Sequence, residues 1–301
     1  MNSKILIAIP VYNGQLGILK TVESCLLQTD PCKIIIVDNC STDLTEKIIK
    51  DHYHTNQYVD YYRNENNLGR TGNWNRVLDI FQGYPHEYIK FLFCGDELKP
   101  SCIEEVNNVI KMYPKIGAIV FDYEFNNYEK ISISKNKLDG YLSVEKVAKL
   151  NMIDGGFLGS IVSNVYGKIA IGTNRFSSLF IGKNDFDFSV LYNKDAFYIP
   201  KVLSRTNIDH RKTFKLSIDY WIQCEYVFNR SFWLEKYKNQ LSESDYSFAK
   251  KRIFLDFIKA NHEYFSFKVY FEVIIISSRI AFINLIKLSY KTFLNLFARK
   301  R

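Results

Sequence analysis

The chain has 301 residues, of which 47% are hydrophobic and 24% are charged, and its formal net charge is +8. An apolar fraction of this size can bury a substantial core, which excludes an intrinsically disordered protein. The length fits one large domain or two small ones.

The first hundred residues alternate short apolar runs with helix-like patterns. We predict strands at 5–9, 33–37, 58–62 and 88–93, and helices at 16–28, 43–51 and 73–82. The run at 33–37 reads KIIIV, as expected of a parallel strand that is buried on both faces. The repeated strand–helix order predicts an α/β fold with a doubly wound, mostly parallel sheet.

Three of the predicted strands are followed by side chains that can bind a ligand. They are Tyr12 and Asn13, Asp38 and Asn39, and Asp96 and Glu97. The carboxyl ends of parallel strands meet at one edge of an open sheet, where ligands bind. A charged turn that starts a helix near Pro100 is the alternative explanation for the third pair. Three such strand ends together favour a nucleotide site.

The second half has a less regular pattern. We predict a helix at 101–113, a strand at 116–123 and loops over a site at 151–178, a segment rich in Gly, Ser and Asn. The sequence GKNDFDFSVLY at 182–192 places Asp185 and Asp187 at the start of a helical or extended apolar stretch. Beyond about residue 215 the pattern is helical to the end of the chain.

The cysteines and the N-terminal residues bear on the compartment. The six cysteines form no CxxC pair and have no accompanying His spacing, which argues against a structural zinc site and a disulfide framework. The N-terminal apolar run is too short for a signal peptide and has no cleavage-site pattern. We therefore expect a cytoplasmic protein.

Four stretches of the first hundred residues, taken in order, resemble the family-2 glycosyltransferases of the GT-A fold. They are IAIPVYNG at 7–14, VDNCSTD at 37–43, NENNLGRTGNWNRVL at 64–78 and FLFCGDELKP at 91–100. NDFDFSVLY at 184–192 is similar to the acidic acceptor-side motif of that family. The resemblance implies a Rossmann-like GT-A fold with a nucleotide-sugar-binding half at 1–100 and an acceptor-binding half at 101–215. A helical, amphipathic C-terminal extension at 216–301 would follow them.

The resemblance also implies a reaction. Members of the family transfer a sugar from a nucleoside-diphosphate sugar to an acceptor hydroxyl, usually with inversion, and bacterial members commonly build surface polysaccharides. The expected enzyme is hexosyltransferase-like, and its acceptor is a glycan or a lipid-linked saccharide. A divalent cation, Mn²⁺ or Mg²⁺, would neutralise the leaving diphosphate. Asp96 is the expected metal ligand, with Glu97 and His210 as further candidates.

By motif position, the donor-binding residues are expected to be Pro10, Tyr12, Asp38, Asn39, Arg70, Asn75, Gly95 and Asp96. The chain departs from the family pattern twice. Cys94-Gly95-Asp96 stands where the family often has Asp-x-Asp, so metal-independent chemistry stays open. Asn39 stands where the family often has a second acid, and its amide can both donate and accept hydrogen bonds.

Inversion needs a base that takes the acceptor proton, normally a carboxylate. Asp185 is the expected base, with Asp187 as the alternate. Asn184 stands where the family usually has Glu before that Asp. One of the two acids could instead cap a helix.

The C-terminal segment 264–301 is apolar but interrupted by charged residues. Residues 261–301 carry seven Lys and Arg against two Glu, a net charge of +5. A basic amphipathic helix of this type is attracted to anionic lipids, so we expect a peripheral contact with the inner face of the cell membrane. Packing on the protein's own core or on a subunit partner is the alternative.

Two other classes of function compete with a transferase. A catalytically silent GT-A domain that binds a nucleotide sugar or a glycan is compatible with the altered Asp-x-Asp motif. A nucleic-acid adaptor is suggested by charge alone, but the positive charge gathers in an apolar tail rather than in a basic stripe with stacking aromatic residues. No nucleic-acid partner is expected.

Overall fold

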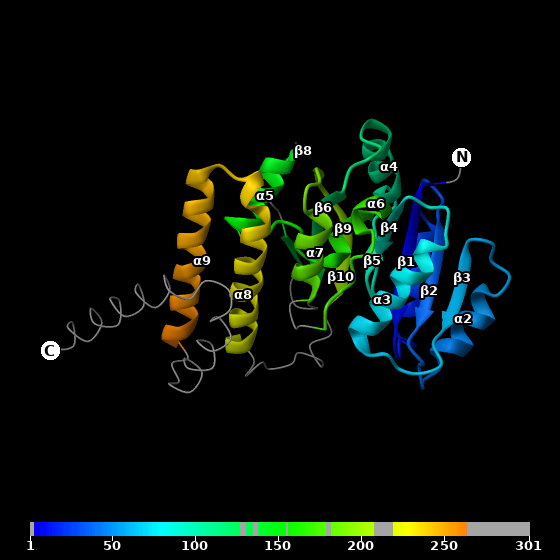
Figure 1. Cartoon of the computed structure of the whole chain (residues 1–301). Coiled ribbons are helices and arrows are strands. Elements are labelled where there is room, and N and C mark those ends of the chain that lie inside the picture. The colour runs from blue at the N-terminus through cyan, green and yellow to red at the C-terminus, as the bar shows by residue number, and fades with distance from the viewer. Residues whose placement is uncertain are drawn as a thin grey trace. The chain divides into compact units, whose positions relative to one another are not determined.

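The computed structural model describes residues 3–126, 131–134, 138–154, 156–178, 182–207 and 219–263 (Figure 1). The chain separates into a compact unit, Met1–Ile253, and a second unit that begins at Phe254. The first unit contains the whole sheet. Residues 264–301, for which a membrane contact was predicted, lie outside the described residues.

Ten strands form one sheet within the described residues. They are β1 (Ile5–Val11), β2 (Lys33–Asp38), β3 (Val59–Arg63), β4 (Tyr88–Phe91), β5 (Glu97–Leu98), β6 (Ala118–Asn126), β7 (Ile131–Ser134), β8 (Gly140–Leu142), β9 (Asn164–Gly167) and β10 (Ala196–Asn207). The order is β3-β2-β1-β4-β9-β6-β10-β5, with β7 on β6 and β8 on β10. β1, β2, β3, β4, β6 and β10 run parallel to one another, and β9 lies antiparallel between β4 and β6.

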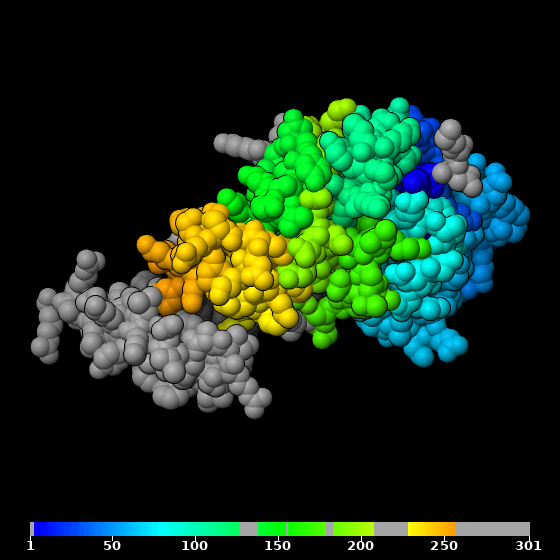
Figure 2. All heavy atoms as spheres, turned by 45° about the horizontal axis from the view of Figure 1, so that its top comes forward, coloured from blue at the N-terminus to red at the C-terminus, as the bar shows by residue number. Residues whose placement is uncertain are grey.

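The helices of the described residues are α1 (Ile18–Leu26), α2 (Thr45–Tyr53), α3 (Gly69–Gln82), α4 (Cys102–Met112), α5 (Val144–Met152), α6 (Lys168–Ile171), α7 (Gly182–Leu191), α8 (Asp219–Tyr237) and α9 (Glu243–Glu263), with short 3₁₀ turns η1 (Ile161–Ser163) and η3 (Lys238–Gln240). α1, α2 and α4 cover one face of the sheet, and α3, α5, α6 and α7 cover the other. Figure 2 shows the green residues of α5 to α7 between the blue-to-cyan part of the sheet and the yellow α8.

Alternation along each strand divides the core into two layers. In β1, Leu6 and Ala8 pack in the cluster that contains α3, whereas Ile5, Ile7 and Ile9 pack in the cluster that contains α1, α2 and α4. Successive side chains of a strand point to opposite faces, and a sheet buried on both faces therefore needs continuous apolar strands. The predicted fold class, a mostly parallel α/β sheet with a helical C-terminal part, is confirmed.

The elements missed from the sequence lie mainly in the second half. β9 and η1 lie in the segment that was expected to be loops, and β10 was not predicted. β10 contains Pro200 and Lys201, and its register with β6 shifts between Ile199 and Val202 and again before Ser204. These irregularities break the alternation by which a strand is recognised.

Lys90 is a fully buried charge in the middle of the sheet. Its ammonium group donates hydrogen bonds to the carbonyl oxygens of Phe91 at 2.9 Å and Val162 at 2.5 Å. Ser204 Oγ donates to the same Val162 oxygen at 3.0 Å, so the node joins β4, η1 and β10. Burial lowers the pKa of Lys90 to about 8, while Cys102 and Asp96 act in the opposite direction.

Gly17 lets the start of α1 approach the turn that follows β4. A Cβ at Gly17 would lie 2.9 Å from the backbone nitrogen of Gly95 and 3.0 Å from its Cα, and backbone atoms cannot move aside cheaply. We expect Gly17→Ala to lower the free energy of unfolding by about 1–3 kcal/mol, the usual cost of overpacking. Chemical denaturation measures this change.

Gly83 provides the matched control for that variant. It lies at the end of α3 with φ −78°, and its added Cβ would have no neighbour closer than 3.5 Å. Gly83→Ala should change stability by less than about 0.5 kcal/mol. Equal effects of the two variants would contradict the proposed close contact at Gly17.

The lowered pKa of Lys90 predicts a pH dependence of stability. Because the unfolded state holds the lysine proton up to a pH of about 10.5, it binds more protons than the folded state between that pH and about 8. The free energy of unfolding therefore rises as the pH increases from about 8 to about 10.5, and this gain is lost as the pH falls back through 8. Relative to Lys90→Met, the wild type should gain about 1–3 kcal/mol between pH 8 and 10.5. Parallel stability curves from denaturation would contradict this.

Candidate active site

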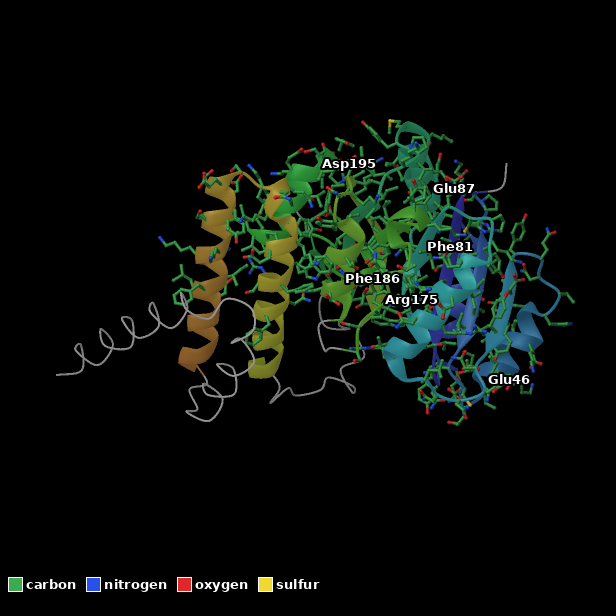
Figure 3. The ribbon with its side chains drawn as sticks, in the orientation of Figure 1. Glu46, Phe81, Glu87, Arg175, Phe186 and Asp195 are labelled. Atoms are coloured by element: carbon green, nitrogen blue, oxygen red, sulfur yellow. The ribbon has the colours of Figure 1, made fainter. Side chains whose placement is uncertain are left out.

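The loops after β1, β2 and β4 meet at the carboxyl edge of the sheet. The last residue of β1, Val11, is in register with the last residue of β2, Asp38, and the Leu92 N–H donates to the Ala8 carbonyl at 2.9 Å. Figure 3 labels one residue at each edge of the sheet. Glu87 precedes β4 and lies at the amino edge, and Glu46, in the first turn of α2 after β2, lies at the carboxyl edge. The three strand ends predicted from the sequence therefore share one edge.

Hydrogen bonds join the loop after β1 to the loop after β2. The Asn13 N–H donates to Ser41 Oγ at 2.9 Å, and Asn13 Oδ1 accepts from the Thr42 N–H at 2.8 Å. The Gly14 N–H donates to Thr45 Oγ1 at 2.8 Å. Asn13 has φ 51°, a left-handed conformation that Asn tolerates better than most residues. This connection fixes the backbone that carries Tyr12, whose side chain is 49% exposed.

Asp38 is fully buried and both of its oxygens have partners within the protein. Oδ1 accepts from the Ser41 N–H at 2.9 Å and from Ser41 Oγ at 2.5 Å. Oδ2 accepts from the Tyr61 hydroxyl at 2.7 Å and from Arg63 Nη1 at 2.8 Å. A sugar-nucleotide donor could hydrogen-bond to this carboxylate only by displacing Ser41, Tyr61 or Arg63.

Asn39 is also committed to internal hydrogen bonds. Its Oδ1 accepts from the Leu68 N–H at 2.8 Å and from Asn64 Nδ2 at 3.1 Å, and its own amide group donates to Asn67 Oδ1 at 2.8 Å. Asn64 Nδ2 also donates to Asn73 Oδ1 at 2.9 Å. The asparagines of NENNLGRTGN thus hold the entry to α3 against the end of β2.

Asp96 lies on a turn that is held from two sides. Gly95, with φ 96°, donates its N–H to Thr21 Oγ1 at 2.8 Å, and that hydroxyl donates to the Asp96 carbonyl at 2.9 Å. From the other side, the Asn207 N–H donates to Asp96 Oδ1 at 3.1 Å, and Asn207 Nδ2 donates to the Gly95 carbonyl at 2.7 Å. A residue with a Cβ would be strained at position 95.

The Asp96 carboxyl is 5% exposed. Burial raises its pKa to about 7, against the opposing effects of the Asn207 N–H and the Lys90 charge. An ionised carboxylate that is buried with few hydrogen bonds is destabilised, and a bound cation would stabilise it. The environment of Asp96 therefore suits a residue that is completed by a positive ligand.

Few described side chains near Asp96 could share a divalent cation with it. Glu97 is engaged by Lys20 Nζ at 2.7 Å and by Asn207 Nδ2 at 3.1 Å, and these contacts lower the pKa of its carboxyl against the effect of burial. The described residues contain no cluster of three or more metal-binding side chains. Mg²⁺ and Mn²⁺ sites often use one or two carboxylates with phosphate oxygens and water, which Asp96 fits. His210, the other metal candidate, lies outside the described residues.

Arg70 lies on an aromatic stack that leads to the turn after β4. Its guanidinium lies 5.4 Å from the Trp74 ring centroid, and Trp74 stacks on Phe93 with ring centroids 5.2 Å apart. The Phe93 carbonyl in turn accepts the Asp96 N–H at 2.9 Å. Arg70 is exposed and, within the described residues, no carboxylate pairs with it. It is available to an anionic ligand.

Pro10 and Asn75 occupy structural positions. Pro10 is buried within β1, opposite Val37. Asn75 donates from Nδ2 to the Phe176 carbonyl at 2.9 Å and accepts the Phe176 N–H at 2.8 Å, which joins α3 to the segment before α7. Their assignment to donor binding stays a prediction, and these contacts favour a supporting role.

The two acids of the acceptor-side motif lie on α7 in different surroundings. Asp185 is half-buried, and its Oδ1 accepts from Asn229 Nδ2 at 2.7 Å and from Trp233 Nε1 at 2.9 Å, both on α8. Asp187 is buried, forms an ion pair with Lys183 and accepts from the Tyr166 hydroxyl at 2.7 Å. Burial raises the pKa of Asp187, opposed by these two partners. The internal ion pair makes Asp187 the weaker candidate for a base.

Two residues of the site were missed in the sequence. Thr21 is a buried hydroxyl on the inner face of α1, and Asn207 is the last residue of β10. Neither belongs to a motif, and Asn207 reaches the Asp96 turn only because β10 pairs with β5 in the folded sheet, with Arg205 opposite Glu97. A correct prediction of β10 from the sequence would have been needed to place Asn207 near Asp96.

Several solved structures have similar folds. TarS of S. aureus in complex with UDP, residues 1–349, superposes with a TM-score of 0.62 at 15% identity, covering 87% of this chain and 72% of that one. The mannosyltransferase PcManGT of Pyrobaculum calidifontis, in complex with GDP-Man and Mn²⁺, superposes with a TM-score of 0.54 at 12% identity, covering 98% and 81%. At these identities, the likeness establishes the GT-A fold.

Curated relatives match over part of their length. The GalNAc(5)-diNAcBac-PP-undecaprenol beta-1,3-glucosyltransferase of Campylobacter jejuni is 25% identical over 202 residues, which cover 66% of this chain and 62% of that protein. The putative teichuronic acid biosynthesis glycosyltransferase TuaG of Bacillus subtilis is 34% identical over 97 residues, 32% of this chain and 37% of that protein. The chain thus spans less than two thirds of these relatives.

The family model described as glycosyl transferase family 2 matches residues 6–167, more than half of the chain. This range contains all of β1 except its first residue, β2 to β4, the turn that carries Asp96, and the strand β9. Both the fold and this match agree with the resemblance of the four motifs. The chain therefore belongs to glycosyltransferase family 2.

Proposed function

We propose that this chain transfers a sugar from a nucleoside-diphosphate sugar to a hydroxyl of a glycan or lipid-linked saccharide, with inversion, in the synthesis of a cell-surface polysaccharide. The observation that carries the proposal is the Asp96 turn. It presents a buried carboxyl at the carboxyl edge of a parallel sheet, beside an aromatic stack that carries Arg70, for which no carboxylate partner is found in the described part of the chain. Acid and guanidinium together suit a diphosphate that binds with a cation.

The donor would bind across the loops after β1, β2 and β4. Tyr12 is exposed at the end of β1 and can contact the base or the ribose, and Arg70 can contact the diphosphate. Asp38 and Asn39 would act mainly through the loops that they hold. A divalent cation bound by Asp96 would neutralise the charge that develops on the departing diphosphate.

Asp185 is the proposed base. Its Oδ1 is oriented by Asn229 and Trp233, and no hydrogen bond to Oδ2 is found within the described residues. An ionised carboxylate with one oriented oxygen and one available oxygen can accept the proton of an attacking hydroxyl. Asp187 keeps Lys183 and Tyr166 in place on the same helix.

Two features support a lipid-linked acceptor. The name of the Campylobacter jejuni relative includes PP-undecaprenol, a lipid diphosphate. Residues 264–301, with their basic and apolar sequence, would bring the enzyme to the inner face of the membrane. Within the described residues, no helix has both the length and the apolar composition of a membrane span.

The first test is calorimetric titration of UDP-, GDP- and dTDP-sugars with Mn²⁺, Mg²⁺ or EDTA. It should be done at about pH 8, where a carboxyl with a pKa of about 7 is mostly ionised. We expect selective, cation-dependent binding that Asp96→Asn weakens about tenfold or more, because the amide can still accept the Asn207 hydrogen bond but carries no charge.

Asp79→Asn is the matched control for that titration. Asp79 is a half-exposed carboxylate on α3 that pairs with Arg175, away from the Asp96 turn. It should leave binding unchanged. Binding that is indifferent to EDTA and to Asp96→Asn would contradict the cation site, and absence of binding to every donor would contradict the transferase.

The second test addresses the base through Asp185→Asn. The substitution preserves an oxygen for Trp233 and Asn229 but removes the proton acceptor. We expect turnover to fall by about 10²–10⁴-fold, the usual contribution of general base catalysis, with donor affinity unchanged. Initial rates of sugar transfer and the same titration measure the two quantities. Full activity of Asp185→Asn would exclude Asp185 as the base. Donor binding without any turnover by the wild type would instead support a catalytically silent domain.

A further inference from the structure

Lys90 places a positive charge inside the sheet, on the strand that leads to the Asp96 turn. Its side chain is fully buried, and among the described residues no carboxylate forms an ion pair with it. The carbonyl oxygens of Phe91 and Val162 accept its hydrogen bonds, and the Phe121 ring centroid lies 5.3 Å from the ammonium nitrogen. Carbonyl groups and an aromatic ring stabilise this charge without cancelling it, so its electrostatic field extends beyond these contacts.

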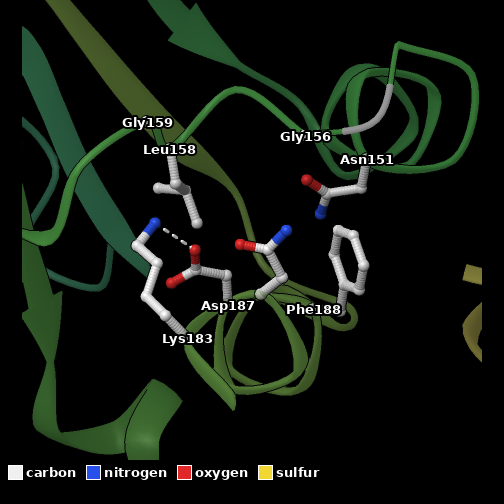
Figure 4. A pocket seen from close by; sticks show the side chains of 8 residues that line it. Asn151, Gly156, Leu158, Gly159, Lys183, Asp187 and Phe188 are labelled. Carbon is white, nitrogen blue, oxygen red and sulfur yellow. Dashed lines mark hydrogen bonds and ion pairs between the residues drawn. The ribbon is translucent and has the colours of Figure 1, made fainter. Parts of the chain in front are cut away.

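Lys183, at the start of α7, shows the contrasting arrangement. It lines a pocket and forms an ion pair with Asp187, which Figure 4 marks with a dashed line. Opposite charges at this separation cancel at longer range, so a ligand several ångströms away meets little field from the pair. Lys90 has no such partner in the described part of the chain, and its charge therefore acts on a ligand at the nearby sheet edge.

β10 connects Lys90 to Asp96. Ser204 Oγ donates to the Val162 carbonyl that also accepts from Lys90, and three residues later the Asn207 N–H donates to Asp96 Oδ1 at 3.1 Å. Three residues of an extended strand span about 10 Å, which sets the scale of the separation between the two charged groups. Burial shifts the pKa of each group toward its neutral form, and the opposite charge of the other group acts against this shift.

The other carboxylates described beside this turn already have cationic partners. Glu97 pairs with Lys20 at 2.7 Å. Glu124 pairs with Arg205 at 2.7 Å and with Lys99 at 3.2 Å, and Arg205 lies opposite Glu97 in the sheet. These two acids are therefore neutralised by their own partners and do not offset the charge of the buried lysine.

A positive charge in this place has opposite effects on the two ligands of the donor site. It repels a free divalent cation at the Asp96 carboxylate, and it attracts the negative charges of a diphosphate. A cation that is already bound to the diphosphate brings no excess positive charge into the site, because the phosphate oxygens offset it. The buried lysine thus favours the cation–diphosphate complex over the free cation.

We propose that Lys90 is a positioning residue of the donor site, whose buried charge makes Asp96 bind a divalent cation together with the donor's diphosphate and weakens its affinity for the free cation. The proposal rests on the proposed function, because it concerns the cation and the diphosphate that the donor site would hold. Lys90 acts only through its charge, since its side chain is fully buried and reaches neither ligand.

Lys90→Gln tests this role, because it removes the charge and keeps a hydrogen-bond donor for Val162. With Mn²⁺ alone at pH 7, a lysine with a pKa of about 8 is mainly charged. We expect the variant to bind Mn²⁺ about three- to thirtyfold more tightly than the wild type, and to bind a nucleoside diphosphate in EDTA about two- to tenfold more weakly. Electron paramagnetic resonance of free Mn²⁺ and calorimetric titration of UDP, GDP and dTDP measure these affinities on the full chain.

The opposite signs separate an effect of charge from an effect of structure. A substitution that merely loosened the sheet would weaken the cation and the nucleotide together. Lys4→Met is the control for net charge, because Lys4 pairs with Glu87 at the amino edge (Figure 3), and it should change neither affinity.

Lys90→Met gives the answer if Lys90→Gln does not fold. It should act in the same direction, and an apolar side chain of similar volume relieves the cost of burying a charge. Thermal unfolding of each variant verifies that it is folded.

The pH provides a second readout of the charge. Near pH 9, under anaerobic conditions, the wild-type lysine is mainly neutral, so the ratio of the two Mn²⁺ affinities should approach one. Cys25 of α1 and Cys102 of α4 also act on this lysine, but burial raises the pKa of each thiol to about 12 and both stay uncharged. Asp96 becomes ionised in both proteins, so the ratio of affinities reports the charge of Lys90.

Two results would overturn the role of Lys90. One is an Mn²⁺ affinity of Lys90→Gln and Lys90→Met that does not exceed that of the wild type, and the other is a parallel loss of cation and nucleotide binding. A gain in Mn²⁺ affinity in a chain that binds no nucleotide, with or without cation, would contradict the proposed function and leave the charge effect in place. Cation-dependent nucleotide binding that both variants leave unchanged would contradict the role of Lys90 alone.

Discussion

The turn from Phe93 to Glu97 is the constraint on which the geometry of the site depends. Gly95 has a left-handed conformation, and its N–H and carbonyl are bound by Thr21 of α1 and Asn207 of β10. The start of α1 touches the same turn through Gly17, which tolerates no side chain there. Two elements far apart in the sequence therefore orient the turn that carries the Asp96 carboxyl.

Three charged side chains in and beside the sheet, Asp38, Lys90 and Asp96, are buried, and they differ in the hydrogen bonds that stabilise their charge. Asp38 has four hydrogen bonds from Ser41, Tyr61 and Arg63, which satisfy its charge internally. Lys90 donates to the carbonyl oxygens of Phe91 and Val162, and burial lowers its pKa. Among the described residues, the Asp96 carboxyl accepts a hydrogen bond from the Asn207 N–H, and burial raises its pKa. This contrast supports the prediction that Asp96 binds a cationic ligand, and it favours a supporting role for Asp38.

The same reasoning separates the two acids of α7. A single helical turn places Asp185 toward α8 and Asp187 toward Tyr166 in the sheet, because positions two apart on a helix face different directions. Asp187 forms an ion pair with Lys183 and also accepts from the Tyr166 hydroxyl. Neighbouring carboxylates in one motif thus acquire unlike surroundings, and their chemistry differs for that reason.

The sequence by itself determined the alternation of strands and helices in the first hundred residues. KIIIV and the other apolar runs could only be buried between two layers of helices, and the residues that follow them had to meet at one edge. The four motifs and their order also pointed to the family and to Asp96. Strand–helix alternation and the order of the motifs can be read from the sequence, because neither depends on contacts between residues that are distant in the chain.

Tertiary structure decided which of the motif residues are free to bind. Asn39 and Asn75 look like ligand groups in the sequence, but their amides are used by Leu68 and Phe176, residues that only folding brings near. Asn207 was not singled out from the sequence, because its role depends on the pairing of β10 with β5. Burial and hydrogen-bond partners are long-range properties, and they become defined only when the chain is packed.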